Sequence, residues 1–131
     1  MKYLMLIYTN PRNWGHPAFL HSEDAVTLPA AEREALARQL DELITEIDGS
    51  GELLAVQALA DPGLTRTIRV RDGATLSTDG PFIEAKEQMA GAFVLDVATP
   101  ERAAEIAARI PEARFTAVEL RPIMDPSGQE M

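Results

Sequence analysis

The sequence predicts an α+β domain whose elements run in the order strand, helix, strand, β-hairpin, strand, helix, strand. Two segments carry helical signals: residues 29–48 repeat apolar side chains every three or four positions, and residues 99–110 begin with a typical helix start. Short apolar runs bounded by Gly, Pro or Asp predict the strands. The 131 residues suit one domain, which we expect over residues 1–124, with a frayed tail at residues 125–131.

A long loop separates the first predicted strand from the first predicted helix. Lys2–Tyr8 is apolar and rich in aromatic and branched side chains, which is typical of a buried strand. Residues 9–28 show no periodicity, and long loops in compact domains are often functional. Proline suits the first turn of the helix that we expect at Pro29–Asp48. Its apolar stripe consists of Leu36, Leu40, Leu43, Ile44 and Ile47.

The second half of the chain holds the hairpin and the second helix. The strands are expected at Glu52–Leu59, Thr65–Arg71, Ala74–Thr78, Gly91–Val97 and Phe115–Ile123. Asp72-Gly73 favours a two-residue hairpin turn, and Thr99-Pro100 supplies an N-cap and a first helical proline. Pro122 lacks an N–H group and predicts an edge position. Without the hairpin, the order is the βαββαβ of ferredoxin-like folds, in which both helices cover one face of the sheet.

The other face of the sheet should be polar in a monomer, but the first strand is apolar on both faces. Tyr3, Met5 and Ile7 alternate with Leu4 and Leu6. The second strand likewise sets Leu53, Ala55 and Leu59 against Leu54, Val56 and Ala58. Because most oligomers are symmetric dimers, a second copy packed sheet to sheet is the simplest cover, and we predict a homodimer.

Charge and composition exclude several classes of protein. The formal net charge is −9, and residues 23–52 hold nine of the 21 acidic residues with only two basic ones. This balance argues against nucleic acid and anionic membranes as partners. The chain has no cysteine, which excludes disulfides, thiolate nucleophiles and cysteine-ligated metals. Without a recognisable signal peptide or membrane span, we expect a soluble cytoplasmic protein with no cofactor.

Residues 79–87, Asp-Gly-Pro-Phe-Ile-Glu-Ala-Lys-Glu, combine turn formers with charges of both signs. Such a group can tune a carboxylate for acid–base work, and the alternative is a turn with solvated ion pairs. The segment closely resembles the DGPFAETKE signature of the DGPF proteins in the YCII-related superfamily. Residues 1–8 and 91–97 resemble them too, as do residues 107–111 followed by 118–123.

This resemblance implies a ferredoxin-like fold and a dimeric α/β barrel. In some YCII-related proteins a histidine on the first helix pairs with an aspartate at the position of Asp79, and the pair is proposed to be catalytic. Asp79 matches, but the helix Pro29–Asp48 has no histidine. Genes of DGPF proteins often neighbour genes for extracytoplasmic-function sigma factors, which makes a sigma factor a candidate partner.

Two loop histidines are candidates to replace the missing one. His16 and His21 follow the first strand, and either imidazole near Asp79 would form an acid–base pair. The alternative is that both histidines are simply exposed. Their spacing matches no metal motif, so no metal site is predicted. The candidate catalytic residues are therefore Asp79, His16 and His21.

A small-molecule ligand is the other candidate partner. Tyr8, Trp14 and Phe82 could line an apolar pocket for an aromatic ligand, although Tyr8 and Phe82 also fit the core. The candidate ligand-binding residues are Tyr8, Trp14, Phe82, Glu84, Lys86 and Glu87. Arg66, Arg69 and Arg71 form a basic stripe suited to an acidic ligand or the acidic helix of a neighbour, or else to a solvated strand edge.

Three functions remain open from sequence. The first is a small-molecule enzyme of the lyase or isomerase type with an acid–base site around Asp79. The second is a non-enzymatic ligand-binding or regulatory accessory of an extracytoplasmic-function sigma factor. The third is a structural module without chemistry. The fold class alone does not choose among them, because function depends on sites rather than on the scaffold.

Overall fold

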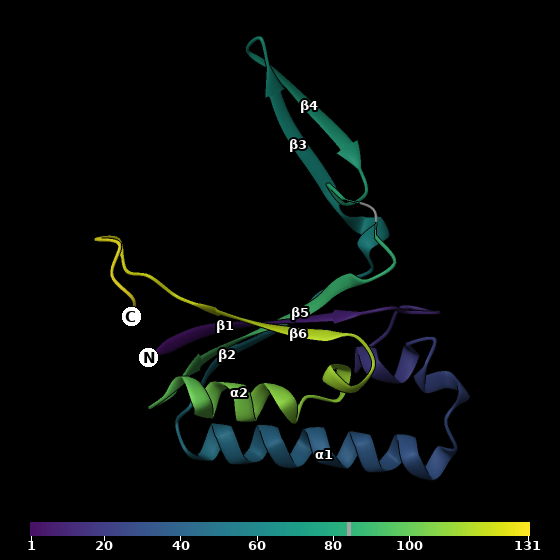
Figure 1. Cartoon of the computed structure of the whole chain (residues 1–131). Helices are drawn as coiled ribbons and strands as arrows, with labels where there is room; N and C mark the ends of the chain where they lie inside the picture. The colour runs from purple at the N-terminus through teal and green to yellow at the C-terminus, as the bar shows by residue number, and fades with distance from the viewer. Residues whose placement is uncertain (84) are drawn as a thin grey trace.

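The computed structural model, which describes residues 1–83 and 85–131, places one antiparallel sheet over two helices and projects a hairpin from the opposite side (Figure 1). The sheet contains β1 (Lys2–Thr9), β2 (Leu53–Ala58), β5 (Gln88–Asp96) and β6 (Ala117–Pro122). The helices are α1 (Ala30–Gly49) and α2 (Pro100–Ala108). The hairpin consists of β3 (Arg66–Arg71) and β4 (Ala74–Asp79). The predicted α+β class is confirmed.

The strand order of the sheet is β2-β5-β1-β6, with every neighbouring pair antiparallel. β1 and β2 are therefore parallel to each other with β5 between them, which is the split βαβ arrangement. The topology is compatible with the predicted ferredoxin-like fold. Pro122 lies at the end of the edge strand β6, where a missing N–H group breaks no ladder between two neighbours.

Local sequence signals set the helix starts. Pro29 directly precedes α1, and the Thr99 hydroxyl accepts a hydrogen bond from the backbone N–H of Arg102 at 3.1 Å, with Pro100 in the first turn. Both helices pack their apolar stripes onto one sheet face. The core consists of Tyr3, Met5, Ile7, Leu43, Ile47, Phe93, Leu95, Val97, Ala103, Ile106, Ala107 and Ile110.

The sheet face away from the helices is largely apolar along its two central strands. Leu4 pairs with Val94 and Leu6 pairs with Ala92, and these side chains alternate with the buried ones of β1 and β5. Together with Tyr8, these residues form what we term the open face. All of its members except Tyr8 are aliphatic. The prediction that the first strand is apolar on both faces is confirmed.

The face assignment of β2 differs from strict alternation. Leu53 pairs with Leu95, and Val56 pairs with Phe93, so both lie on the helix side of the sheet. Alternation had placed Leu53 and Val56 on opposite faces. The register shifts between Leu53 and Ala55, and this irregularity inserts one extra residue into the strand. As a result, Val56 faces α1.

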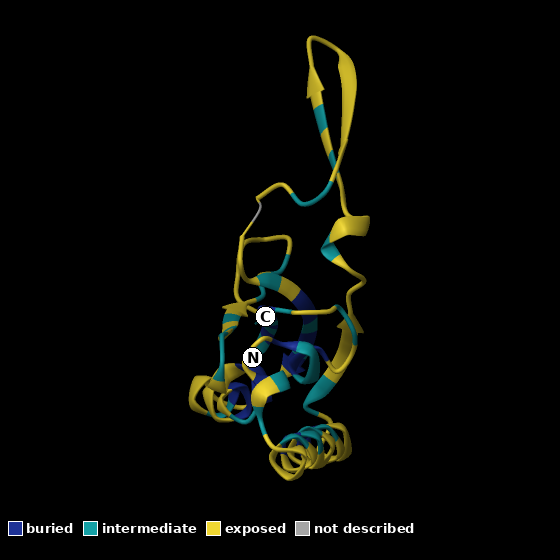
Figure 2. Ribbon diagram, turned by 90° about the vertical axis from the view of Figure 1, so that its right-hand side faces the viewer, coloured by how far each residue is buried: buried dark blue, intermediate teal, exposed yellow. Residues whose placement is uncertain are grey.

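The hairpin, residues 66–79, stands apart from the body, and we call it the arm (Figures 1 and 2). The predicted Asp72-Gly73 turn is confirmed, with φ of 50° and 76°, as a two-residue turn with two left-handed positions requires. At its base, the Thr67 hydroxyl donates to the Gly80 carbonyl at 2.9 Å. Most arm residues are exposed (Figure 2).

The C-terminal residues fold back instead of fraying. The backbone N–H of Met131 donates to Ile123 at 2.8 Å, and the N–H of Lys2 donates to the carbonyl of Met131 at 2.6 Å. Met124 and Glu130 form an isolated bridge. The end of the chain therefore packs beside the start of β1, a long-range contact with no local sequence signal.

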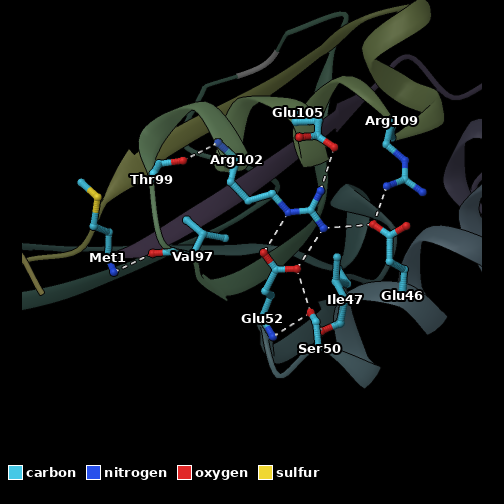
Figure 3. A network of polar contacts seen from close by, with 10 residues as sticks. All are labelled: Met1, Glu46, Ile47, Ser50, Glu52, Val97, Thr99, Arg102, Glu105 and Arg109. Atoms are coloured by element: carbon cyan, nitrogen blue, oxygen red, sulfur yellow. Dashed lines mark hydrogen bonds and ion pairs between the residues drawn. The ribbon is translucent and has the colours of Figure 1, made fainter.

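One arginine connects α2 with the end of α1 and the start of β2 (Figure 3). Arg102 pairs with Glu52 at 2.9 Å, with Glu46 at 3.0 Å and with Glu105 at 2.8 Å. Arg109 adds a second contact to Glu46 at 2.6 Å. Some acids of the first helix region are therefore structural rather than merely solvated.

Candidate functional site

The long loop after β1 is ordered by its own polar groups. It contains two short 3-10 turns, Ala18–His21 and Ala25–Thr27. The Ser22 hydroxyl donates to the carbonyl of Phe19 at 2.9 Å and accepts from the N–H of Ala25 at 3.0 Å. Phe19 is fully buried. These bonds satisfy the turn backbone and fix how the loop leaves β1.

Two loop side chains attach to a single backbone carbonyl just beyond β2. Trp14 donates its indole N–H to the carbonyl of Leu59 at 3.0 Å, and Nε2 of His16 lies 2.5 Å from the same oxygen. A carbonyl oxygen only accepts, so Nε2 carries a proton. The two rings meet edge to face with centroids 5.8 Å apart. The loop is thereby fastened against the sheet edge.

A pocket of about 310 Å³ opens between α1, the edge strand β2, β5 and this loop. Most of its wall is apolar, with Ile7, Leu40, Ile44, Val56, Ala58 and Phe93 among the lining residues. The bulge in β2 directs Val56 into this wall. His16 and Glu112 are the ionisable residues among those lining the pocket. The wall thus joins an apolar surface to two ionisable side chains, as small-molecule sites commonly do.

Glu112 is the buried acid of the pocket. It follows α2 in a short 3-10 turn, Pro111–Arg114, and is only 6% exposed. Burial raises the pKa of its carboxyl group above the ordinary glutamate value, while hydrogen bonds from the backbone of Glu112 and Phe19 and the nearby His16 oppose that rise. Sequence reasoning missed Glu112, because nothing around Pro111 distinguishes a buried acid from a solvated one.

The structure does not bring the candidate catalytic residues together within one chain. Asp79 ends β4 at the base of the arm, where it is exposed and pairs across the hairpin with Arg66. His16 lines the pocket, and His21 lines a separate hollow beside Arg33 of α1. Among the hydrogen bonds and ion pairs of residues 1–83 and 85–131, none joins Asp79 to either histidine.

The candidate ligand-binding residues are also dispersed. Tyr8 lies on the open face, where burial and a hydrogen bond with Glu119 raise the pKa of its phenol. Trp14 lies beside the pocket because its ring meets that of His16, which lines the pocket. Phe82 is 70% exposed, outside the core, with the guanidinium of Arg69 5.1 Å from its ring centroid.

The other described residues of the signature segment follow the base of the arm. Lys86 and Glu87 are exposed, and Glu84 lies outside the described residues. Pro81 lines a hollow of about 320 Å³ together with Leu59 and Met89.

Within residues 1–83 and 85–131, no three His, Asp or Glu side chains gather as metal ligands would. In the same part of the chain, no helix is long and apolar enough to cross a membrane.

Comparison with known proteins identifies the family. The family model of the YCII-related domain matches residues 1–127. An uncharacterized protein of Rhizobium meliloti (strain 1021) is 31% identical over 94 residues, which cover 70% of this chain and 76% of that protein. The chain therefore belongs to the YCII-related family.

Proposed function

We propose that this protein binds a small, mostly apolar molecule in the pocket between α1, β2 and the loop, and that His16 and Glu112 exchange protons with it. One observation carries the proposal: a loop imidazole and a buried carboxyl group with a raised pKa line the same apolar pocket. Titratable groups with perturbed pKa values in a concave site are typical of acid–base chemistry.

The two groups are suited to different roles. A raised pKa keeps Glu112 protonated further toward neutral pH, so its carboxyl group can donate a proton to a ligand oxygen. His16 uses Nε2 to hold the carbonyl of Leu59, which leaves Nδ1 as the ring nitrogen for accepting a proton. Removing a proton at one atom and delivering one at another is the chemistry of isomerases and lyases.

We further propose that the chain belongs to the DGPF subgroup and forms a homodimer. Residues 79–87 support the subgroup, and the role of Asp79 in catalysis rests on that resemblance. The apolar open face, with Leu4, Leu6 and Val94, supports a second copy packed sheet to sheet into a dimeric α/β barrel. We also propose that residues 1–124 form a single domain.

A ligand screen that follows the intrinsic tryptophan fluorescence tests the proposed pocket. Trp14 is the sole tryptophan, and its indole meets the ring of the pocket-lining His16. We expect phenols, lactones or cyclic ketones to change its fluorescence in a saturable way. Val56→Phe should fill the pocket and abolish this response, whereas Val70→Phe on the distant arm should not. A response that survives Val56→Phe would contradict the proposed site.

Turnover separates an enzyme from a binding protein. For each compound that binds, His16→Gln keeps an N–H donor for Leu59 but removes the imidazole and its Nδ1 acceptor. We expect turnover to fall by about 10²–10⁴-fold in this variant while binding remains. If wild-type protein binds a ligand without converting it, the alternative of a regulatory accessory, such as a partner of an extracytoplasmic-function sigma factor, is favoured.

A further inference from the structure

The arm exposes apolar side chains that nothing in the described chain covers. Ile68 is 57% exposed, Val70 is 58% exposed and Leu76 is 47% exposed. Ile68 and Val70 lie on one face of the hairpin, and Leu76 lies on the other face opposite Arg69. A lone two-stranded hairpin is marginally stable in water, so a projecting one with apolar side chains on both faces calls for a contact.

The direction of the arm indicates where that contact lies. The arm projects from the side of the sheet opposite the helices, which is the side of the open face (Figure 1). A molecule seated on Leu4, Leu6 and Val94 would therefore stand beside the arm. Two unpartnered apolar surfaces on one side of the body are most simply covered by one occupant.

The arm carries three arginines against Asp72 and Asp79, and this net positive charge favours an acidic occupant. Arg66, Arg69 and Arg71 all lie on β3. Within the described residues, the ion pairs of this protein involve none of these three arginines. The chain itself is strongly acidic, with a net charge of −9, and α1 carries exposed acids such as Glu34, Glu42 and Asp48. The body of a second copy thus supplies the complementary charge.

The length of the arm fits such a contact. Each arm strand has six residues, which at ~3.3 Å per residue gives a reach of ~20 Å. Packed sheets lie ~10 Å apart, so an arm of this length passes the sheet of a copy seated on the open face and extends toward its helix layer. In a twofold dimer, each arm contacts the other protomer and the two open faces cover each other. No copy of either surface is then left for a third chain, so the assembly stops at two.

We propose that the arm is a clasp for a second copy of this chain: the open faces pack together, and each arm lies along the acidic α1 side of the other protomer. This inference rests on the homodimer of the proposed function and adds a contact to it. It assigns the Asp-Gly hairpin a role in assembly rather than in the pocket.

Sedimentation equilibrium tests the clasp with the full chain. Val70→Ser combined with Arg71→Glu changes two exposed arm residues. This change should raise the dimer dissociation constant by about tenfold or more. Arg12→Glu, an equal charge reversal in the exposed loop, should leave the constant unchanged. An unaltered circular dichroism spectrum in each variant shows that folding is intact. A dimer insensitive to the arm change would overturn the clasp alone, whereas a monomeric wild-type protein would overturn the homodimer as well.

Disulfide trapping locates the contact, and the absence of native cysteine makes it clean. Protein with Val70→Cys is mixed with protein carrying Glu34→Cys, Glu42→Cys or Asp48→Cys and oxidised. We expect a cross-linked dimer for at least one of the three mixtures. The matched control repeats the mixture in a Leu6→Glu background, where the open face no longer pairs and the cross-link should vanish. No cross-link along α1 in an intact dimer would overturn the clasp.

Discussion

Nε2 of His16 lies 2.5 Å from the carbonyl oxygen of Leu59. This contact holds the imidazole of a loop histidine in place, and His16 lines the same pocket as Glu112. Because the imidazole is fixed by one nitrogen, its second nitrogen is held in a defined place, which is what acid–base catalysis requires of a side chain.

Glu112→Gln should change how stability depends on pH. Burial raises the pKa of the folded-state carboxyl group, so its stabilising contribution is complete below the ordinary glutamate pKa and is lost as pH rises through the raised value. Glutamine does not ionise, and the variant should therefore lose less stability than wild type on going from pH 4 to pH 8. Urea unfolding at several pH values measures this. If the free energy of unfolding changes with pH in the same way for wild type and Glu112→Gln, the raised pKa of Glu112 is contradicted. Glu130→Gln in the exposed tail is the matched control.

Arg102→Ala should destabilise the fold and weaken its dependence on acid pH. The hydrogen bond from Arg102 lowers the pKa of Glu52 to about 2, so the stability from this pair is present above the ordinary glutamate pKa and is lost as pH falls toward 2. Because both side chains are partly exposed, we expect a loss of only about 1 kcal/mol at neutral pH. Thermal unfolding at pH 7 and pH 3 measures the stability lost in Arg102→Ala, with Arg38→Ala on α1 as the control. An equal loss at both pH values would contradict the assigned role of Glu52.

Gly91→Ala should disturb both the sheet edge and the pocket. A Cβ atom at this position would lie 2.8 Å from the backbone carbonyl oxygen of Gln57, and both residues line the pocket. Since this neighbour is backbone, β2 must shift, at a cost of about 1–3 kcal/mol. Gly49→Ala is the matched control, because its Cβ meets nothing within 4 Å. Chemical unfolding gives the stability, and Trp14 fluorescence reports any change in the pocket. Equal stabilities of the two variants would contradict the close approach of β2 to β5.

Leu6→Glu should dissociate the proposed homodimer. Leu6 lies on the open face opposite Ala92, and a charge there cannot be buried against a second sheet without a large cost. Ala104→Glu adds the same charge on the exposed side of α2 and should leave the dimer intact. Light scattering after size exclusion at micromolar concentration distinguishes the two. If Leu6→Glu remains dimeric, the interface lies elsewhere.

The candidate site shows where sequence reasoning reached its limit. The segment at residues 79–87 was recognisable because its motif is local, but its described residues lie at the base of the arm and none of them lines the pocket. His16 was a candidate by residue type alone, and its bond to Leu59 joins positions that no pattern connects. Glu112 carried no signal, because burial depends on what the rest of the chain packs around it.

Elements whose cause is local could be predicted from the order of the residues. Pro29 and Thr99-Pro100 set the helix starts, and Asp72-Gly73 set the hairpin turn, because capping groups and left-handed positions act within a few residues. The bulge in β2, the returning C-terminus and the pocket that unites His16 with Glu112 became visible only in the folded chain. These features follow from packing between distant segments, where the free energy depends on shape and burial rather than on neighbouring residues.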